Sequence, residues 1–259
     1  MLDYSDLCRM VQDIAREAGE YIRSQRETFS FGNVEFKGAH NLVSYVDKEA
    51  ERMVIKGLSE ILPGSGFLAE EGGGEYGGQS CKWIIDPLDG TTNFVHGLPP
   101  YCVSIALEEE GEIVLGVVYE ITLREMFYAW KGSDAWMNGR KIAPSKVDDL
   151  GNSLVAIGFS YSALQIDNFL DTVADYQRNT DGIRRLGSAA TDLVYVACGR
   201  FDAYAQVNLA PWDVAAGAFI ARRAGACVSD YSGGGDYVYG KQVVAATPLV
   251  YNQFMGTVK

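Results

Sequence analysis

The sequence contains only two histidines, His40 and His96, and no Gly-x-Ser-x-Gly motif. A hydrolase with a nucleophilic serine on a strand-to-helix turn needs that motif together with a histidine base. Zinc sites are usually built from clustered histidines and cysteines, and the chain has no such cluster. The sequence therefore favours neither a serine hydrolase nor a zinc enzyme.

The five cysteines are scattered, odd in number and without C-x-x-C spacing. Most lie among apolar neighbours, where a free cysteine behaves as a small hydrophobic residue. This pattern predicts reduced thiols and a cytoplasmic protein rather than a disulfide framework. The acidic N-terminus does not have the pattern of a secretory signal, and no apolar run is long enough to span a bilayer. We therefore expect no membrane partner.

Basic residues are in the minority, because 22 lysines and arginines stand against 34 aspartates and glutamates, for a net charge of −12. Nucleic acids attract basic faces, so we do not expect a nucleic acid as a partner. A small phosphorylated substrate is still compatible with this charge, since bound divalent cations would reverse the sign of the local field.

At 259 residues the chain could form one large domain or two modest ones. We divide it into an N-terminal α+β half, residues 1–145, and a C-terminal α/β half, residues 146–259. The first half is predicted to contain two helices, 5–26 and one capped by Asp47, then strands at 67–69, 83–85, 103–107, 113–119 and 125–129. The second half is predicted to contain strands at 154–157, 203–205 and 243–245 and helices at 166–176, 189–197 and 214–224.

The most informative segment is Trp83–Phe94, in which an apolar run ends in two carboxylates, Asp86 and Asp89. Paired carboxylates at the end of a strand are typical ligands of hard divalent cations. Gly90 then permits a tight turn, and Thr91-Thr92 is suited to capping a short helix whose free N–H groups could bind phosphate oxygens. Together these features predict metal-assisted hydrolysis of a phosphate ester.

Four more acidic residues stand at junctions between an apolar element and a loop. Glu70-Glu71 closes the strand at 67–69, Asp213 precedes the helix at 214–224, and Asp47 stands where a helix cap is expected. Two metal ions bridged by shared carboxylates need about this many acids. Taken alone, Asp47 or Asp213 is better explained as a helix cap, whereas the Asp86/Asp89 pair is not, because Gly-Thr-Thr-Asn follows it.

Three further segments are open to two interpretations. Gly72–Gly77 spells G-x-G-x-x-G, but no helix begins inside it, so a flexible loop that metal could order is the better account. The N–H groups of Gly187, Ser188 and Ala189 could bind substrate hydroxyls or an anion, or Ser188 could simply cap a helix. Lys37 could neutralise phosphate, although a solvated position is slightly favoured for it. His96 could line the site, although a surface position is at least as compatible with it.

These motifs resemble the inositol monophosphatase family, within the wider group of metal-dependent, lithium-sensitive sugar phosphatases. The resemblance is carried by Glu70-Glu71, by the block from Asp86 to Phe94 and by the block from Trp212 to Gly217, which occur in the family's order. Weaker similarity is found at residues 41–47, 187–189 and 224–226, so that the resemblance covers nearly the whole chain. The two blocks together are highly specific.

The resemblance implies a layered α/β/α/β/α sandwich, a homodimer and a metal site between the two halves of the chain. The working metal would be magnesium, with about two to three ions per active site. The implied metal ligands are Glu70, Asp86, Asp89, Asp213 and the Leu88 carbonyl. Thr91, hydrogen-bonded to Asp47, would orient the attacking water together with Glu70. The implied phosphate and substrate contacts are Asp89, Gly90, Thr91, Gly187, Ser188, Ala189, Gln206 and Asp213.

The predicted function is Mg²⁺-dependent hydrolysis of a phosphate monoester of inositol or of a similar polyol or sugar. Two departures from the family pattern bear on this. Gln206 stands where inositol-specific members tend to carry a glutamate, and Gly72-Gly73 replaces a hydroxyl residue, which predicts a looser loop. The alternatives are fructose 1,6-bisphosphatase activity, nucleotide 3′-phosphatase activity, which Gly90-Thr91-Thr92 disfavours, and a non-catalytic protein that binds metal or phosphoinositide.

Overall fold

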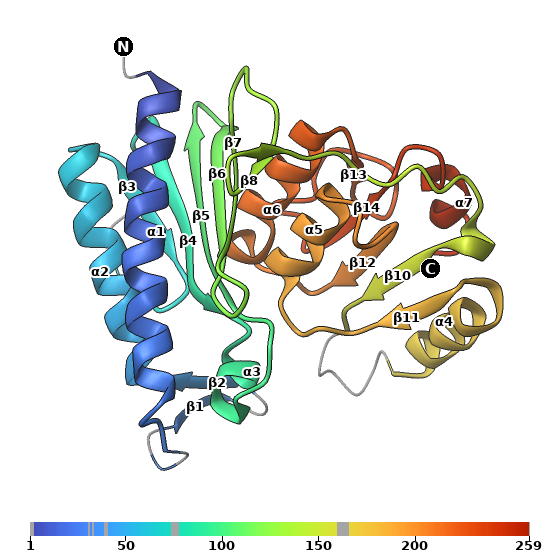
Figure 1. Ribbon diagram of the computed structural model, residues 1–259, viewed down its shortest axis with the longest axis horizontal. Coiled ribbons are helices and arrows are strands. Elements are labelled where there is room, and N and C mark those ends of the chain that lie inside the picture. The colour runs from blue at the N-terminus through green and yellow to red at the C-terminus, as the bar shows by residue number, and fades with distance from the viewer. Residues whose placement is uncertain are drawn as a thin grey trace.

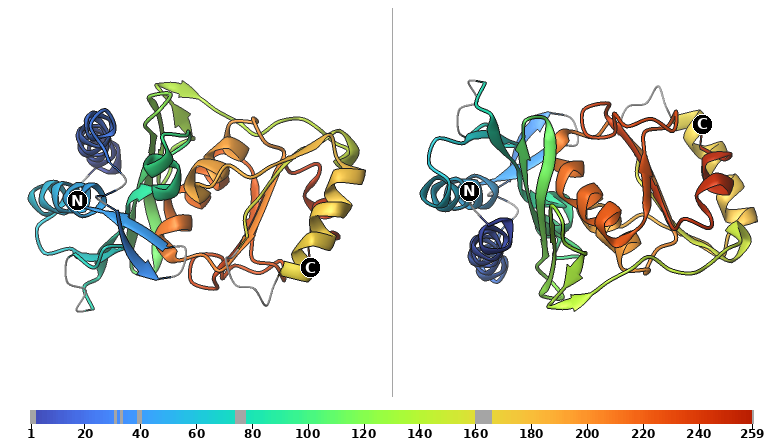
Figure 2. Two further views of the ribbon diagram at one scale, coloured as in Figure 1. Left: turned by 90° about the horizontal axis from the view of Figure 1, so that it is seen from below. Right: turned by 90° about the horizontal axis from the view of Figure 1, so that it is seen from above.

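The chain folds into five alternating layers of helices and sheets, as the computed structural model shows in Figure 1 and Figure 2. The structure describes residues 3–30, 32, 34–38, 41–73, 78–159 and 166–258, and it describes side chains for these residues except 34–38, 41–42 and 166–169. The order of layers is two helices, a seven-stranded sheet, two helices, a five-stranded sheet and two outer helices. The predicted sandwich is therefore confirmed.

The first layer consists of α1 (Tyr4–Arg26) and α2 (Tyr45–Ile61). Leu7, Val11 and Ile22 repeat at helical spacing on α1 and are fully buried against the sheet. Burying a side chain of this size stabilises the fold by about 1.5–3 kcal/mol. A two-stranded sheet of β1 (Val34–Gly38) and β2 (Asn41–Ser44), which periodicity did not predict, leads into α2.

The seven-stranded sheet has the order β3-β4-β5-β6-β7-β8-β9, in which only β3 and β4 are parallel. Its strands are β3 (Gly66–Ala69), β4 (Cys81–Asp89), β5 (Cys102–Glu109), β6 (Glu112–Glu120), β7 (Glu125–Trp130), β8 (Trp136–Met137) and β9 (Arg140–Lys141). Strand β4 is longer than predicted, because it continues through Asp86 to Asp89 before α3 (Thr91–His96).

The middle layer consists of α5 (Ala189–Ala197) and α6 (Pro211–Ala224), which are buried between the two sheets. Small residues allow this close packing: a Cβ on Gly116 of β6 would lie 2.9 Å from the Ala216 carbonyl oxygen of α6. The hydroxyl of Ser104 on β5 also donates to the Trp212 carbonyl oxygen at 3.2 Å. The start of α6 is therefore fixed against the end of β4 and the start of β5.

The five-stranded sheet has the order β11-β10-β12-β14-β13. Its strands are β10 (Leu154–Ile157), β11 (Gly182–Arg184), β12 (Ala203–Val207), β13 (Cys227–Ser229) and β14 (Gln242–Ala246). Strand β10 is parallel to β11 and β12, whereas β14 is antiparallel to β12 and β13. Helices α4 (Ile166–Asn179) and α7 (Tyr251–Met255) form the outer layer, and a 3₁₀ turn spans Leu150–Asn152.

The two sheets take their strands from different parts of the sequence, 66–141 and 154–246. The division of the chain at residue 145 into two halves stays a prediction about folding units. Among the described residues, no helix combines the length and the apolar character that crossing a membrane requires.

Candidate active site

Strand β4 carries both aspartates of the central motif, and an irregularity near its end brings them together. On a regular strand, side chains three residues apart point to opposite faces of the sheet. Asp86 pairs with Ser104 and Asp89 with Cys102, so three steps along β4 match two steps along β5. Such a bulge inserts one extra residue and turns the chain. Asp86 and Asp89 can therefore approach the same point.

A third carboxylate reaches that point from the first turn of α6. Asp213 is the third residue of this helix, and its Oδ2 accepts a hydrogen bond from Ala210 N at 2.7 Å. Asp86, Asp89 and Asp213 each contribute one carboxylate oxygen to a group whose members all lie within 4.8 Å of one another. We call these three residues the aspartate cluster. It joins the seven-stranded sheet to the middle helices.

The aspartate cluster is electrostatically strained. Burial raises the pKa of Asp86 well above its usual value, and the charges of Glu70, Asp89 and Asp213 raise it further. Burial and the charge of Asp89 likewise raise the pKa of Asp213. Burial also raises the pKa of Asp89, although the Ser188 hydroxyl partly offsets this by hydrogen bonding. A bound cation would relieve this mutual repulsion.

The chemistry of the cluster fits a hard divalent cation. Its ligand atoms are carboxylate oxygens, the type that Mg²⁺ and Ca²⁺ prefer over nitrogen and sulfur. Zinc sites usually include thiolate or imidazole, and no cysteine or histidine belongs to this group of described residues. The residues present therefore suit magnesium or calcium better than zinc.

Glu70 lies next to the cluster at the end of β3. The residue before it, Ala69, pairs with Ile85, and Glu70 N donates to the Ile85 carbonyl oxygen at 3.2 Å. This register sets Glu70 level with Asp86, and its charge contributes to the raised pKa of that residue. The parallel pairing of β3 with β4 thus brings the Glu70 carboxylate toward the three aspartates.

The prediction that Asp47 caps its helix is wrong. Ser44 is the N-cap of α2, and Asp47 is the third helical residue, with its Oδ2 accepting from Ser44 N at 2.8 Å and from Ser44 Oγ at 2.7 Å. This is a capping box, and its S-x-x-D spacing was readable in the sequence. The second oxygen, Asp47 Oδ1, accepts from the Thr91 hydroxyl at 2.9 Å. Asp47 therefore connects α2 with the phosphate-binding motif.

The prediction that Thr91 or Thr92 caps the short helix is also wrong. Gly90 is the N-cap of α3, with a positive φ of 94° that glycine adopts without strain. Thr91 is the first residue of the helix. Its hydroxyl lies 2.9 Å from Asp47 Oδ1 and 3.0 Å from the Leu88 carbonyl oxygen. The hydroxyl is thus fixed by contacts outside the helix.

Asp89 is held from the start of α5 by contacts that sequence reasoning missed. Its Oδ2 accepts from Ser188 Oγ at 2.7 Å and from Ala190 N at 2.8 Å, and Cys102 Sγ lies at 3.8 Å. Ser188 is also the N-cap of α5, which was one of the two interpretations left open by the sequence. One oxygen of Asp89, Oδ2, is therefore engaged by the start of α5. No local pattern signals such contacts, because they join segments about a hundred residues apart.

Of the remaining candidate residues, the structure describes Gln206 and His96. Gln206, half-buried on β12, accepts a hydrogen bond at Oε1 from the Tyr204 hydroxyl at 2.7 Å. His96 is exposed at the end of α3. The side chain of Lys37 and residues 74–77 of the glycine-rich segment lie outside the described residues.

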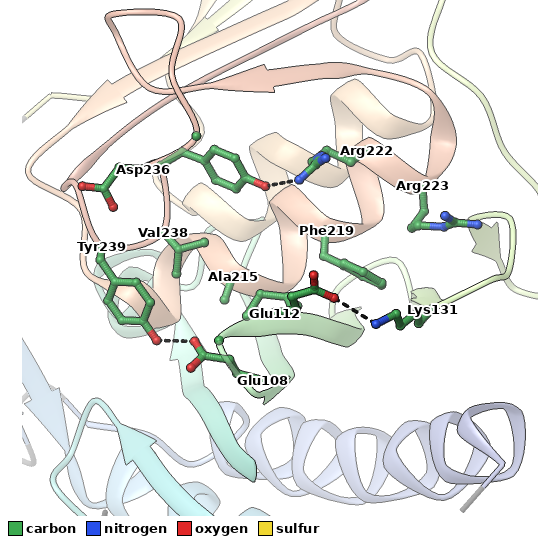
Figure 3. Close-up of a pocket in the computed structure, with 14 residues that line it drawn as sticks. Glu108, Glu112, Lys131, Ala215, Phe219, Arg222, Arg223, Asp236, Val238 and Tyr239 are labelled. Atoms are coloured by element: carbon green, nitrogen blue, oxygen red, sulfur yellow. Dashed lines mark hydrogen bonds and ion pairs between the residues drawn. The ribbon is translucent and has the colours of Figure 1, made fainter. Parts of the chain in front are cut away.

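A separate cavity of about 490 Å³ borders α6 from Ala215 to Arg223, together with residues 108, 111–113 and 235–239 (Figure 3). Arg222 lines it and donates to the Tyr237 hydroxyl at 2.7 Å, and Lys131 pairs with Glu112 at 2.9 Å. None of the three aspartates of the cluster lines this cavity. It is therefore distinct from the candidate active site.

Comparison with known proteins identifies the family. The model of the inositol monophosphatase family matches residues 3–258. An inositol-1-monophosphatase of Mesorhizobium japonicum is 38% identical over 257 residues, covering 98% of this chain and 97% of that protein. A relative named Nus factor SuhB from Escherichia coli strain K12 is 38% identical over 247 residues, covering 95% of this chain and 92% of that protein.

Solved structures agree with this match. The extragenic suppressor protein SuhB of Bartonella henselae superposes with a TM-score of 0.93 at 36% identity, covering 98% of each chain. An IMPase of Thermotoga maritima superposes with a TM-score of 0.90 at 34% identity, covering 98% of this chain and 96% of that one. The chain belongs to the inositol monophosphatase family, a family of phosphatases.

Proposed function

We propose that this protein hydrolyses a phosphate monoester of inositol or of a similar polyol in a Mg²⁺-dependent reaction. The observation that carries the proposal is the aspartate cluster, which lies next to a glycine turn and a fixed threonine hydroxyl. Oxygen ligands suit the cation, and the turn offers backbone N–H groups to a phosphate. Membership in a phosphatase family supports the same chemistry.

In this proposal Glu70, the aspartate cluster and the Leu88 carbonyl oxygen hold two to three cations, about the number used by two-metal phosphatases. When bound, the cations would lower the pKa of water and stabilise negative charge on the leaving oxygen. The backbone N–H groups of Gly90 and Thr91 would hold phosphate oxygens. Thr91 is the first residue of α3, so its N–H has no partner within the helix.

Thr91 and Asp47 would orient the attacking water together with Glu70. The Thr91 hydroxyl donates a hydrogen bond to Asp47 Oδ1. The lone pairs of the Thr91 oxygen are therefore left to accept a hydrogen bond from the attacking water. Ser44 fixes the other oxygen of Asp47, so the acceptor cannot rotate away. The aspartate thus acts through the threonine.

Ser188 should influence the cation through Asp89. Ser188→Ala removes a hydroxyl that bonds Asp89 Oδ2 at 2.7 Å, so the carboxylate loses part of its orientation. Losing a partner of a ligand typically weakens metal affinity by about 10–100-fold. We expect calorimetric titration with Mg²⁺ to show this loss. Ser153→Ala, which removes another fully buried serine hydroxyl far from the cluster, should leave the affinity unchanged.

We expect Gln206 to influence which phosphate ester is preferred, through contacts with the alcohol part of the substrate. Its Oε1 is bonded to Tyr204, so the amide presents mainly its NH₂ donor to a substrate. Gln206→Glu supplies an additional acceptor for sugar hydroxyls, and a hydrogen bond to a charged group contributes about 1.5–3 kcal/mol. We expect kcat/KM for inositol 1-phosphate to rise about tenfold relative to that for glycerol phosphate. An unchanged ratio would remove Gln206 from the substrate site.

The proposal is tested by measuring phosphate release, with and without Mg²⁺, from a panel of phosphate esters. The panel contains inositol 1-phosphate, fructose 1,6-bisphosphate, a nucleoside 3′,5′-bisphosphate and glycerol phosphate. Preference for the second or third compound would indicate one of the alternative phosphatase activities. Release from none of them, with metal bound, would indicate the non-catalytic alternative.

A second candidate function is that of a Nus factor, the role named for the Escherichia coli relative. The 38% identity to that relative favours it. It predicts that a hydrolytically inactive Asp89→Asn variant can replace the natural protein in its host without loss. We also propose a homodimer, which light scattering would test, and a cytoplasmic location, which the five free thiols support.

A further inference from the structure

Glu51, on α2, is a buried carboxylate that the mechanism above does not use. Its side chain is almost fully buried, with the residue only 3% exposed. Its Oε2 accepts from Glu71 N at 2.8 Å, and its Oε1 accepts from Gly73 N at 2.6 Å. Glu71 follows Glu70 directly, and Gly73 lies two residues further along the same loop. We propose that Glu51 is a positioning residue that holds the Glu70 loop in the geometry needed for cation binding.

This proposal rests on the proposed function, because it takes Glu70 to be a ligand of the cation. The backbone on the other side of Glu70 is held by the sheet, because Glu70 N donates to the Ile85 carbonyl oxygen. Glu51 fixes the N–H of the very next residue, Glu71. The Glu70 backbone is therefore anchored before and after its own Cα, which determines where its carboxylate can reach.

Helix α2 would then position two parts of the site at once. Asp47 and Glu51 are four residues apart, so they lie on the same face of the helix. Asp47 bonds the Thr91 hydroxyl after β4, and Glu51 bonds the loop after β3. The spacing of these two acids along one rigid helix fixes the distance between the two loops. A displacement of α2 would move both loops together.

A carboxylate is the side chain that this contact requires. Two backbone N–H donors converge on it, and each oxygen accepts one of them. Bonds from N–H groups to a charged acceptor are roughly twice as strong as neutral ones. A glutamine offers one acceptor oxygen, and its NH₂ group would face the second N–H donor. An alanine would leave both donors without this acceptor.

Gly73 is the loop residue that permits the contact. A Cβ at this position would lie 2.5 Å from Glu51 Oε1 and 3.0 Å from Ile55 Cδ1. Unlike Gly72, whose φ is 80°, Gly73 is not among the positive-φ glycines, so the space and not the backbone angle requires glycine here. The expectation that Gly72-Gly73 loosens the loop stays a prediction, but at Gly73 the missing side chain also leaves room for the hydrogen bond to Glu51.

The test compares Glu51→Gln, Glu51→Ala, Gly73→Ala and the double variant Glu51→Ala/Gly73→Ala with the wild-type protein. Three quantities are measured: Mg²⁺ affinity by calorimetry, exchange of the Glu71 and Gly73 amide protons by NMR, and kcat and KM. Val54→Ala, which removes a fully buried side chain from the same helix, is the control for lost stability. Glu60→Ala, which removes an exposed glutamate of α2, is the control for lost charge.

We expect Glu51→Ala to weaken Mg²⁺ binding about 10–100-fold and to accelerate exchange of both amides, with Glu51→Gln intermediate. The KM for the phosphate ester should change less than kcat. Gly73→Ala should weaken binding in the wild-type background, but it should add little to Glu51→Ala, because the 2.5 Å clash with Glu51 Oε1 is then gone and only the 3.0 Å contact with the flexible end of Ile55 remains. Gly73→Ala and Glu51→Gln keep the test valid if Glu51→Ala does not fold.

Unchanged Mg²⁺ affinity in Glu51→Ala, or equal losses in Val54→Ala at matched stability, would overturn the proposal. Additive effects in the double variant would overturn it as well. The proposed function fails differently: wild-type protein would bind Mg²⁺ and release no phosphate from any ester, while the calorimetric and exchange comparisons would still decide the role of Glu51.

Discussion

Asp89→Asn should lower kcat by about three orders of magnitude while the protein stays folded, a loss at the upper end of those caused by removing one electrostatic group from a site. One oxygen of Asp89 accepts from Ser188 and Ala190, so the asparagine oxygen will be directed to these same donors. Its NH₂ group then takes the position of the other oxygen, Oδ1, and an N–H donor there cannot ligate a cation. The substitution keeps the shape of the side chain and removes its function as a ligand.

The measurement is phosphate release from inositol 1-phosphate at saturating Mg²⁺, with circular dichroism as the check on folding. Asp13→Asn is the control, because it makes the same chemical change on the exposed face of α1, where Asp13 pairs with Arg16. Wild-type turnover in Asp89→Asn would show that this carboxylate is not a ligand of the working metal. A loss of the same size in Asp13→Asn would show that the assay does not report on the site.

The sequence predicted the acidic residues of the site because their types and positions carry chemistry. Asp86 and Asp89 stand at the end of an apolar run, and Asp213 stands at the start of a helix, so both locations were readable from local pattern. The convergence of the three was not readable in the same way. It depends on the bulge opposite Ser104 and Cys102 and on the packing of α6 against β5, which are properties of the folded sheet.

The residues that hold the ligands were largely missed. Glu51 accepts from the backbone N–H of Glu71, and Ala190 donates its own backbone N–H to Asp89. Because every residue except proline has a backbone N–H, the residue types do not reveal these contacts. Ser44 was missed as well, although its spacing from Asp47 is that of a capping box and was readable in the sequence. The strands β11 and β13 were missed since each has only three residues, too few to establish an alternating pattern. Local sequence thus indicated which groups react more clearly than which groups position them.

Asp86→Asn should make the metal-free protein more stable at pH 7, by about 1–2 kcal/mol, the size typical of a single stabilising substitution. Burial and the charges of Glu70, Asp89 and Asp213 raise the pKa of Asp86 well above 3.8. The charged form is thus disfavoured in the folded state. Asparagine removes one of the repelling charges, keeps the oxygen that accepts from Leu88 N, and offers NH₂ donors to the remaining carboxylates.

The sign of the pH dependence follows from the raised pKa. Between pH 3.8 and the raised value, the folded wild-type protein binds a proton that the unfolded chain has released, so its stability falls as the pH rises through this window. Asp86→Asn has no such proton, and its advantage should grow over the same window. At pH 7 the expected gain corresponds to a rise in Tm of about 2–8 °C. Thermal unfolding in EDTA between pH 5 and pH 8 measures it.

Saturating Mg²⁺ should reverse the order, because a ligand that binds only the folded state stabilises it in proportion to its affinity, and the variant has lost a ligand. Asp230→Asn is the matched control, for which we expect the opposite change in folding stability. Hydrogen bonds from the Ser232 hydroxyl and the Gly234 N–H lower the pKa of Asp230, so its charge stabilises the fold and asparagine should reduce stability at pH 7 with or without metal. If Asp86→Asn instead destabilised the metal-free protein, the carboxylates would not repel one another in the folded state. The electrostatic basis for a cation at this cluster would then be lost.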